Sequence, residues 1–156
     1  MVRVKRTVAE PARLERVALD CELPAGRVAR ALGAEPLPFL LAGAWAGGGA
    51  ITGSDPVRVA GDAEDPFELL DDVPAVSGAV PGAVGGGWFG WLGYRLAARV
   101  ERVPMHAERP VALPDFHLAY YDNVLHLDAA GRWWFEALVT GARQEALERR
   151  LARVRR

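Results

Sequence analysis

The sequence predicts one globular domain that contains both strands and helices, and two observations support this. The chain has 156 residues, of which 51% are hydrophobic and 25% charged, which suits a single hydrophobic core and is too apolar for a disordered chain. Short apolar runs bounded by glycine and proline alternate with segments that have helical spacing of apolar residues.

The first elements are a strand and a short helix. Apolar and polar side chains alternate from Leu14 to Leu19, which predicts a strand with one solvent-facing side. Pro24-Ala25-Gly26 breaks this pattern, and Val28 and Leu32 then lie four residues apart, as on one face of a helix. Gly33 is placed where a left-handed helix cap is favoured.

A hairpin and a second helix follow. Phe39–Trp45 and Ile51–Ala60 read as strands joined by the Gly47-Gly48-Gly49 turn, the second interrupted near Asp55-Pro56. Asp65-Pro66-Phe67-Glu68 has the residues of a helix start, namely a cap, a proline in the first turn and a glutamate three residues after the cap. We expect Phe67 and Leu70 to face inward, and the surrounding acidic run to be a solvated helix rather than a cation site.

The middle of the chain contains a long loop and a second aromatic strand. Val73–Gly87, rich in proline, glycine and alanine, reads as a loop, and Trp88–Leu92 as a strand. Tyr94–Val103 has helical character, with Leu96 and Val100 four residues apart. Pro104–Pro114 reads as a linker.

Three strands and a helix complete the chain. Phe116–Tyr121 and Val124–Leu127 are predicted strands, and the turn Asp128–Gly131 leads into the strand Trp133–Leu138 to form a hairpin. Gln144–Arg156 is predicted to be an amphipathic helix with arginines around its apolar face.

Charge and cysteine content restrict the partners and the compartment. The formal net charge is -1, which disfavours nucleic acid and anionic membranes, and we interpret the basic helix at Gln144–Arg156 as a solvated surface. The longest apolar runs, Pro36–Ala46 and Ala83–Leu92, are shorter than the roughly 20 residues of a membrane-spanning helix. With a lone Cys21 and no secretion signal, we expect a cytoplasmic protein without membrane partners.

The sequence offers few catalytic groups. Its two serines, three threonines and single cysteine lie in no activation motif. His106, His117 and His126 are at least nine residues apart, and each is better explained as a strand or loop residue than as a metal ligand. We therefore predict no catalytic residue and no metal site in this chain.

A glycine-rich stretch matches the dinucleotide-binding pattern only superficially. Gly85–Gly90 satisfies G-x-G-x-x-G, but a proline-rich and glycine-rich loop precedes it, and Trp88 and Phe89 occupy the space that a pyrophosphate needs. Gly87, Gly90 and Gly93 instead indicate a strand that another backbone approaches closely.

Several motifs together resemble a known family. They are Phe39-Leu40-Leu41-Ala42-Gly43-Ala44, Gly47-Gly48-Gly49-Ala50-Ile51-Thr52-Gly53-Ser54-Asp55-Pro56, Gly86-Gly87-Trp88-Phe89-Gly90-Trp91-Leu92-Gly93-Tyr94 with Glu101-Arg102-Val103-Pro104, and Leu113-Pro114-Asp115-Phe116 with Tyr121-Asp122. In this order they resemble the N-terminal domain of component I of aminodeoxychorismate synthase and anthranilate synthase, over about residues 36 to 138. The series from Gly86 to Asp122 leans toward the aminodeoxychorismate branch.

The resemblance implies an α+β fold of two packed antiparallel β-sheets with flanking helices. It also implies that residues 1–156 form a non-catalytic N-terminal scaffold or regulatory domain. In the family, a separate chorismate-binding domain, absent from this sequence, binds chorismate and Mg²⁺ and forms the product with ammonia from a glutamine amidotransferase subunit. The resemblance thus implies those two partners and no cofactor in this chain.

The family often binds tryptophan between its sheets, using polar side chains. The matching positions here form the candidate ligand site, which consists of Leu41, Ala42, Gly43, Gly48, Gly49 and Ala50. None of these side chains can hydrogen-bond the ligand's ammonium or carboxylate group, and each lost bond to a charged group forfeits roughly 1.5–3 kcal/mol. We therefore predict that tryptophan does not bind usefully. Arg95 is a second departure, because the family commonly has aspartate there.

The predicted core and the tryptophans complete this interpretation. We expect the sheet core to contain Leu40, Leu41, Phe89, Leu92, Val124, Leu127 and Phe135. Tryptophan is costly to expose, so we expect some of Trp45, Trp88, Trp91, Trp133 and Trp134 to face a partner.

Three alternatives remain open. The parent could be an anthranilate synthase, or the chain could be a free-standing module with a small-ligand pocket framed by Gly47–Gly49 and Val73–Gly87. An independent enzyme is the weakest alternative, because no convergent catalytic set is visible. A reading frame that continues past Arg156 favours the synthase domain, and a stop codon there favours the module.

Overall fold

The computed structural model describes residues 10–102, 104 and 113–156, and it has an α+β fold with two sheets and four helices. The larger sheet has six strands in the order β2-β3-β8-β9-β1-β5. Their bounds are β2 Phe39–Ala42, β3 Ala50–Gly53, β8 Asn123–Leu127, β9 Trp133–Val139, β1 Ala12–Ala18 and β5 Val76–Ser77. The predicted fold class is confirmed, although β1 and β5 pair in parallel.

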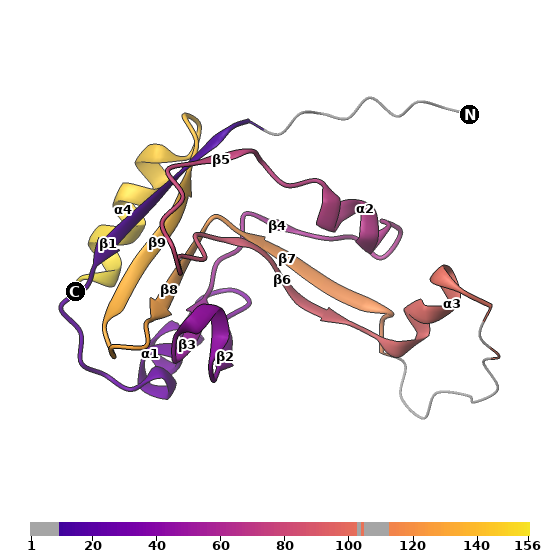
Figure 1. Ribbon diagram of the computed structural model, residues 1–156, viewed down its shortest axis with the longest axis horizontal. Helices are drawn as coiled ribbons and strands as arrows, with labels where there is room; N and C mark the ends of the chain where they lie inside the picture. The colour runs from indigo at the N-terminus through magenta and orange to yellow at the C-terminus, as the bar shows by residue number, and fades with distance from the viewer. Residues whose placement is uncertain (1–9, 103, 105–112) are drawn as a thin grey trace.

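The smaller sheet is antiparallel and has the order β4-β7-β6. Its strands are β4 Arg58–Val59, β7 Phe116–Tyr121 and β6 Gly87–Leu92. Asp122 joins β7 to β8, so one extended segment passes from the smaller sheet into the larger (Figure 1). The predicted strand Ile51–Ala60 is likewise divided, because Asp55 has a φ of 58° and the chain changes sheets there.

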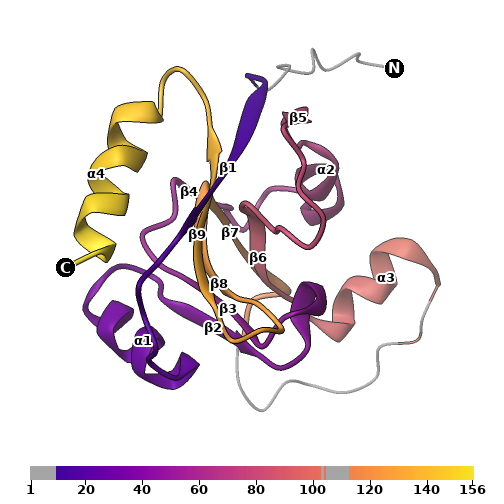
Figure 2. The ribbon, with the colours of Figure 1, turned by 60° about the vertical axis from the view of Figure 1, so that its left-hand side comes forward.

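Helices α1 (Ala25–Ala31) and α4 (Gln144–Val154) lie on one side of the larger sheet (Figure 2). The main hydrophobic core lies between these helices and the strands. It consists of Val28, Leu32, Leu125, Trp133, Phe135, Ala137, Val139 and Leu147. The predicted left-handed cap at Gly33 is wrong, because Gly33 lies in the 3-10 turn η1 (Leu32–Ala34), which the Glu35 N–H closes on the Leu32 carbonyl.

A buried polar contact fastens α4 to the loops of the larger sheet. Arg150 donates to Glu35 Oε2 at 2.5 Å and to Ser54 Oγ at 2.7 Å. Burial raises the pKa of Glu35, but the hydrogen bonds from Ser54 and Arg150 and the charges of Arg150 and Arg153 outweigh it, so this pKa lies below its ordinary value.

The predicted start of α2 (Pro66–Asp71) is confirmed, because the Asp65 carboxylate accepts from the backbone N–H of Phe67 and Glu68. The predicted inward face is wrong. Phe67 and Leu70 are exposed, and Leu69 is buried. Leu69 packs in a second, smaller core with Leu96, Phe116 and Leu118.

The segment after Leu92 is less helical than predicted. It forms the 3-10 turn η3 (Tyr94–Leu96) and the short helix α3 (Ala97–Val100). Leu96 is buried, but Val100 is 71% exposed, so the two do not share a buried face. Val103 and most of the predicted linker Pro104–Pro114, including His106, lie outside the described residues.

Two of the predicted core residues are also exposed. Val124 and Phe135 are buried as predicted, whereas Leu40 and Leu92 are exposed, because strand alternation turns them away from the space between the sheets. Trp133 is buried in the main core. Within the described ranges, no helix has the length and apolarity needed to cross a membrane.

Candidate functional site

A groove of about 650 Å³ lies between the two sheets. We call it the aromatic groove; it is lined by Leu37, Pro38, Phe39, Leu41, Trp45, Ile51, Val84, Trp88, Phe89, Gly90, Trp91, His117 and Tyr121. Its walls come from β2 and β3 on one side and from β6 and β7 on the other. Its volume is typical of small-molecule sites and its lining is mostly apolar.

A cluster of three aromatic rings joins the sheets at this groove. The Phe39 ring from the larger sheet lies 4.4 Å from that of Phe89 and 4.9 Å from that of Tyr121, both in the smaller sheet. Tyr121 donates its hydroxyl proton to the Leu37 carbonyl at 2.7 Å. Burial raises the pKa of Tyr121, so the phenol stays protonated at neutral pH and acts as a fixed structural donor.

The six candidate ligand positions lie together in the β2–β3 hairpin. Leu41 pairs with Ile51, and Ala42 with Ala50. The Gly43 N–H donates to the Gly49 carbonyl at 2.9 Å, which closes the hairpin. Of the six, only Leu41 lines the aromatic groove. The hairpin therefore shapes one end of the groove without offering a polar side chain to it.

The structure explains why Gly48 carries no side chain. A Cβ atom at this position would lie 2.4 Å from the Leu127 carbonyl oxygen and 2.5 Å from His126 Nε2. The adjacent Gly49 N–H donates to the same Leu127 carbonyl at 2.7 Å. The turn, including the short 3-10 turn η2 (Trp45–Gly47), is thus packed directly onto β8, and a polar pocket residue at Gly48 would not fit.

The groove contains little that could perform acid–base or metal chemistry. Its described lining includes no aspartate, glutamate, lysine or arginine, and His117 and Tyr121 are its ionisable side chains. Across the described part of the chain, no three His, Cys, Asp or Glu residues are grouped as a metal site would need. The arrangement offers shape and aromatic surface.

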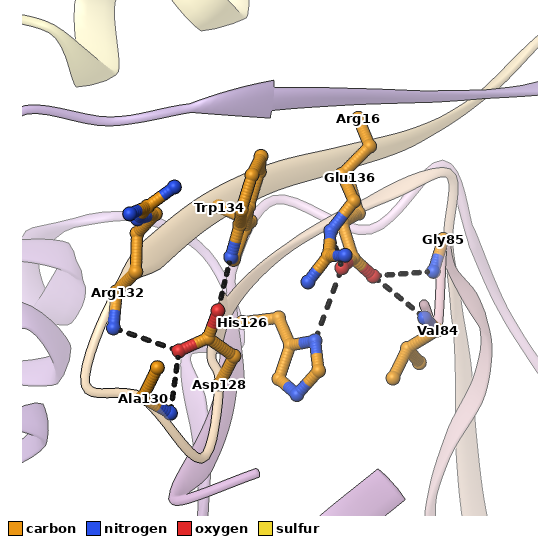
Figure 3. A network of polar contacts seen from close by, with 9 residues as sticks. All are labelled: Arg16, Val84, Gly85, His126, Asp128, Ala130, Arg132, Trp134 and Glu136. Atoms are coloured by element: carbon orange, nitrogen blue, oxygen red, sulfur yellow. Dashed lines mark hydrogen bonds and ion pairs between the residues drawn. The ribbon is translucent and has the colours of Figure 1, made fainter. Parts of the chain in front are cut away.

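Glu136, which the sequence analysis did not single out, is the centre of a buried polar network beside the groove (Figure 3). Its side chain is fully buried. Oε2 accepts from the backbone N–H groups of Val84 at 2.6 Å and Gly85 at 3.0 Å. Oε1 lies 3.0 Å from both His126 Nδ1 and Arg16 Nε. Because a carboxylate only accepts, Nδ1 of His126 carries the proton of its hydrogen bond.

This network fixes one wall of the groove. Val84 lines the groove and belongs to the predicted loop Val73–Gly87, which Glu136 holds against the larger sheet. The loop also contains β5, so it is more ordered than the sequence indicates. His126 is buried and lies next to Gly48, so it connects the Glu136 network to the turn of the β2–β3 hairpin.

Trp134 on β9 and Asp128 in the β8–β9 turn extend the network (Figure 3). The Arg16 guanidinium lies 4.0 Å from the centre of the Trp134 ring, and Trp134 Nε1 donates to Asp128 Oδ2 at 2.7 Å. This bond, with others from the Arg132 and Ala130 N–H groups, holds the pKa of Asp128 below its ordinary value. Asp128 thereby fixes both the β8–β9 turn and the indole ring.

Two tryptophan side chains that line the groove remain partly exposed to solvent. Trp45 is 47% exposed and Trp91 is 41% exposed, and both line the groove. Leu92 and Tyr94, which follow Trp91 in the chain, are also exposed but do not line the groove. We call Trp45 and Trp91 the aromatic rim. Exposed apolar groups gathered at one place are typical of a binding surface.

The chain matches no protein-family model and no curated protein.

Proposed function

We propose that this chain is a non-catalytic N-terminal domain of a chorismate-utilising synthase component I, of the aminodeoxychorismate branch. The observation that carries the proposal is where the resembling motifs lie. Phe39–Ala44, Gly47–Pro56, Gly86–Tyr94 and Tyr121 are separate in sequence, yet each contributes at least one residue to the lining of the aromatic groove. Motifs that meet at one site are better explained by a shared function than by chance similarity.

In this proposal the domain supplies a docking surface. The aromatic rim contacts the chorismate-binding domain, which contributes the chorismate site, the Mg²⁺ and the bond-making groups. The glutamine amidotransferase subunit, which supplies ammonia, is the other proposed partner. The apolar lining of the groove supports a scaffold role, because it holds no convergent acid, base and nucleophile.

The test reconstitutes the enzyme from its parts. This chain is mixed with a separately produced component I chorismate-binding domain and the amidotransferase, and formation of 4-amino-4-deoxychorismate from chorismate and glutamine is measured. We expect association in sedimentation experiments, product only in the full mixture, and loss of both with Trp91→Asp. Arg149→Gln, a change on the exposed face of α4, is the matched control.

Three results bear against the proposal. Turnover of chorismate and ammonia by this chain alone would refute the non-catalytic role. Unimpaired association of the Trp91→Asp variant would refute the aromatic rim as the contact. Formation of anthranilate in place of 4-amino-4-deoxychorismate would assign the chain to the tryptophan-biosynthesis branch.

A free-standing small-ligand-binding module is the second candidate. The observation in its favour is that Trp45, beside the glycine turn, and Val84, in the long loop, both line the groove, as a pocket framed by these segments requires. A neutral aromatic compound such as indole, titrated while tryptophan fluorescence is followed, tests it. Saturable binding that Leu41→Trp abolishes supports the module, and no saturable binding refutes it.

A further inference from the structure

A second cavity, of about 720 Å³, lies on the other side of the six-stranded sheet from the aromatic groove. It is bordered by α1, the end of α4 and the segment that joins β1 to α1, which all lie on that side (Figure 2). Core residues Val28, Leu32, Leu125 and Trp133 form its floor. We call it the helix cavity. Its volume and apolar floor are those of a small-molecule site.

Cationic side chains predominate at the edge of the helix cavity. Arg153, Arg155 and Arg156 line it, and Asp20 and Glu35 are the acidic residues in its lining. Within the described ranges, Arg155 and Arg156 make no ion pair, and both are exposed. Two arginines are therefore available to an anion that enters the cavity.

Glu35 does not cancel this charge, because other groups already neutralise it. Arg150, which is buried, donates to Glu35 Oε2 at 2.5 Å, and Ser54 donates to the same oxygen at 2.5 Å. Arg153 Nε lies 3.7 Å from Glu35 Oε1. With Glu35 paired to Arg150 and Arg153, the two arginines Arg155 and Arg156 outnumber Asp20, the remaining acidic side chain of the lining, and the side chains at the edge of the cavity carry a net positive charge.

We propose that the helix cavity binds an amphipathic monoanion, namely an apolar chain or ring that carries one carboxylate. The apolar body lies on Leu125 and Trp133, where it removes hydrocarbon surface from water. The carboxylate lies at Arg155 and Arg156, since a guanidinium group is the natural partner of a carboxylate. This site is separate from the aromatic groove and does not depend on the proposed docking function.

Cys21 provides a reporter for the test, since it is the only cysteine of the chain, is partly buried, and lines the helix cavity. The probe is decanoate, below the concentration at which it forms micelles. We expect saturating decanoate to slow the reaction of Cys21 with a thiol reagent several-fold. Decyltrimethylammonium, which has the same chain and the opposite charge, is expected to protect Cys21 at least tenfold more weakly.

Two charge-matched double variants locate the carboxylate. Arg155→Gln/Arg156→Gln is expected to weaken decanoate binding about tenfold, from the loss of two exposed ion pairs. Arg95→Gln/Arg99→Gln removes the same charge from η3 and α3 and should leave the affinity unchanged.

Three outcomes would overturn the proposal. They are no calorimetric binding of decanoate, binding that leaves Cys21 unprotected, and equal affinity in the two double variants. The second outcome would place the probe elsewhere, for example in the aromatic groove. None of the three bears on whether the aromatic rim docks a partner domain, so failure of this proposal is distinguishable from failure of the proposed function.

Discussion

The buried carboxylate of Glu136 provides a test of how the groove is held in shape. Oε2 accepts two backbone N–H groups, from Val84 and Gly85, while Oε1 faces Arg16 and His126. Glutamine is nearly the same size but offers one oxygen and one NH₂ group. In Glu136→Gln, either the two backbone N–H groups or His126 Nδ1 and the Arg16 cation must therefore face an NH₂ group in place of an oxygen.

The expected loss of stability is large. Breaking a buried ion pair by removing one partner typically costs about 3–5 kcal/mol, and we expect about 3 kcal/mol here because Arg16 is partly exposed. For a urea dependence of about 2 kcal/mol per molar, the unfolding midpoint falls by about 1.5 M. Tryptophan fluorescence follows the transition. Glu145→Gln, which breaks an exposed pair with Arg149, should lose less than about 0.5 kcal/mol.

A local measurement separates this mechanism from general destabilisation. Hydrogen exchange at the Val84 and Gly85 amides should accelerate more in Glu136→Gln than exchange in β8. If Glu136→Gln does not fold, Arg16→Gln, which leaves Glu136 its two backbone donors and His126, should show an intermediate loss. A Glu136→Gln protein within about 0.5 kcal/mol of the wild type would refute the reasoning.

Three further predictions concern other parts of the molecule. Gly90→Ala places a Cβ 1.8 Å from the His117 carbonyl oxygen and should lose at least about 2 kcal/mol in urea unfolding, whereas Gly26→Ala, with open space around it in α1, should be neutral or stabilising. Trp134→Phe removes the hydrogen bond that lowers the pKa of Asp128 most. The pKa of Asp128 should therefore be higher in this variant, as measured by a carboxyl NMR titration. Because a depressed carboxylate pKa adds stability that is lost as the pH falls through the folded-state pKa, the variant should also begin acid unfolding at a higher pH. Calorimetry should detect no useful tryptophan binding, and low-micromolar affinity would contradict the absence of polar groups at the six candidate positions.

Local signals predicted the elements well where they were strong. Asp65 and Pro66 identified the start of α2 because capping depends on neighbouring residues alone. The face that α2 buries depends on β7 and η3, which are distant in sequence, and Leu69 therefore takes the place expected for Phe67 and Leu70. The prediction that Leu40 lies in the core is wrong for the same reason, because the face that a strand buries depends on residues distant in sequence.

The sequence does contain a signal for the buried contact between His126 and Glu136. His126 and Glu136 are polar residues within otherwise apolar strands, and the predicted hairpin around Asp128–Gly131 pairs His126 with Trp134 and Val124 with Glu136. Since side chains alternate along strands, His126 and Glu136 must share one face. The remaining partners, Val84 and Gly85, were not predictable, because nothing in a glycine-rich loop specifies where its N–H groups will dock.

The buried polar side chains beside the aromatic groove already contact one another. Glu136 contacts His126 and Arg16 on the face of the larger sheet that meets the aromatic groove, and its bond to the Val84 N–H fixes the groove wall. A reactive acid or base needs an unfilled position for substrate, whereas the Glu136 carboxylate already has four partners within 3.0 Å. The groove beside it has aromatic walls and an exposed rim, a combination typical of binding surfaces.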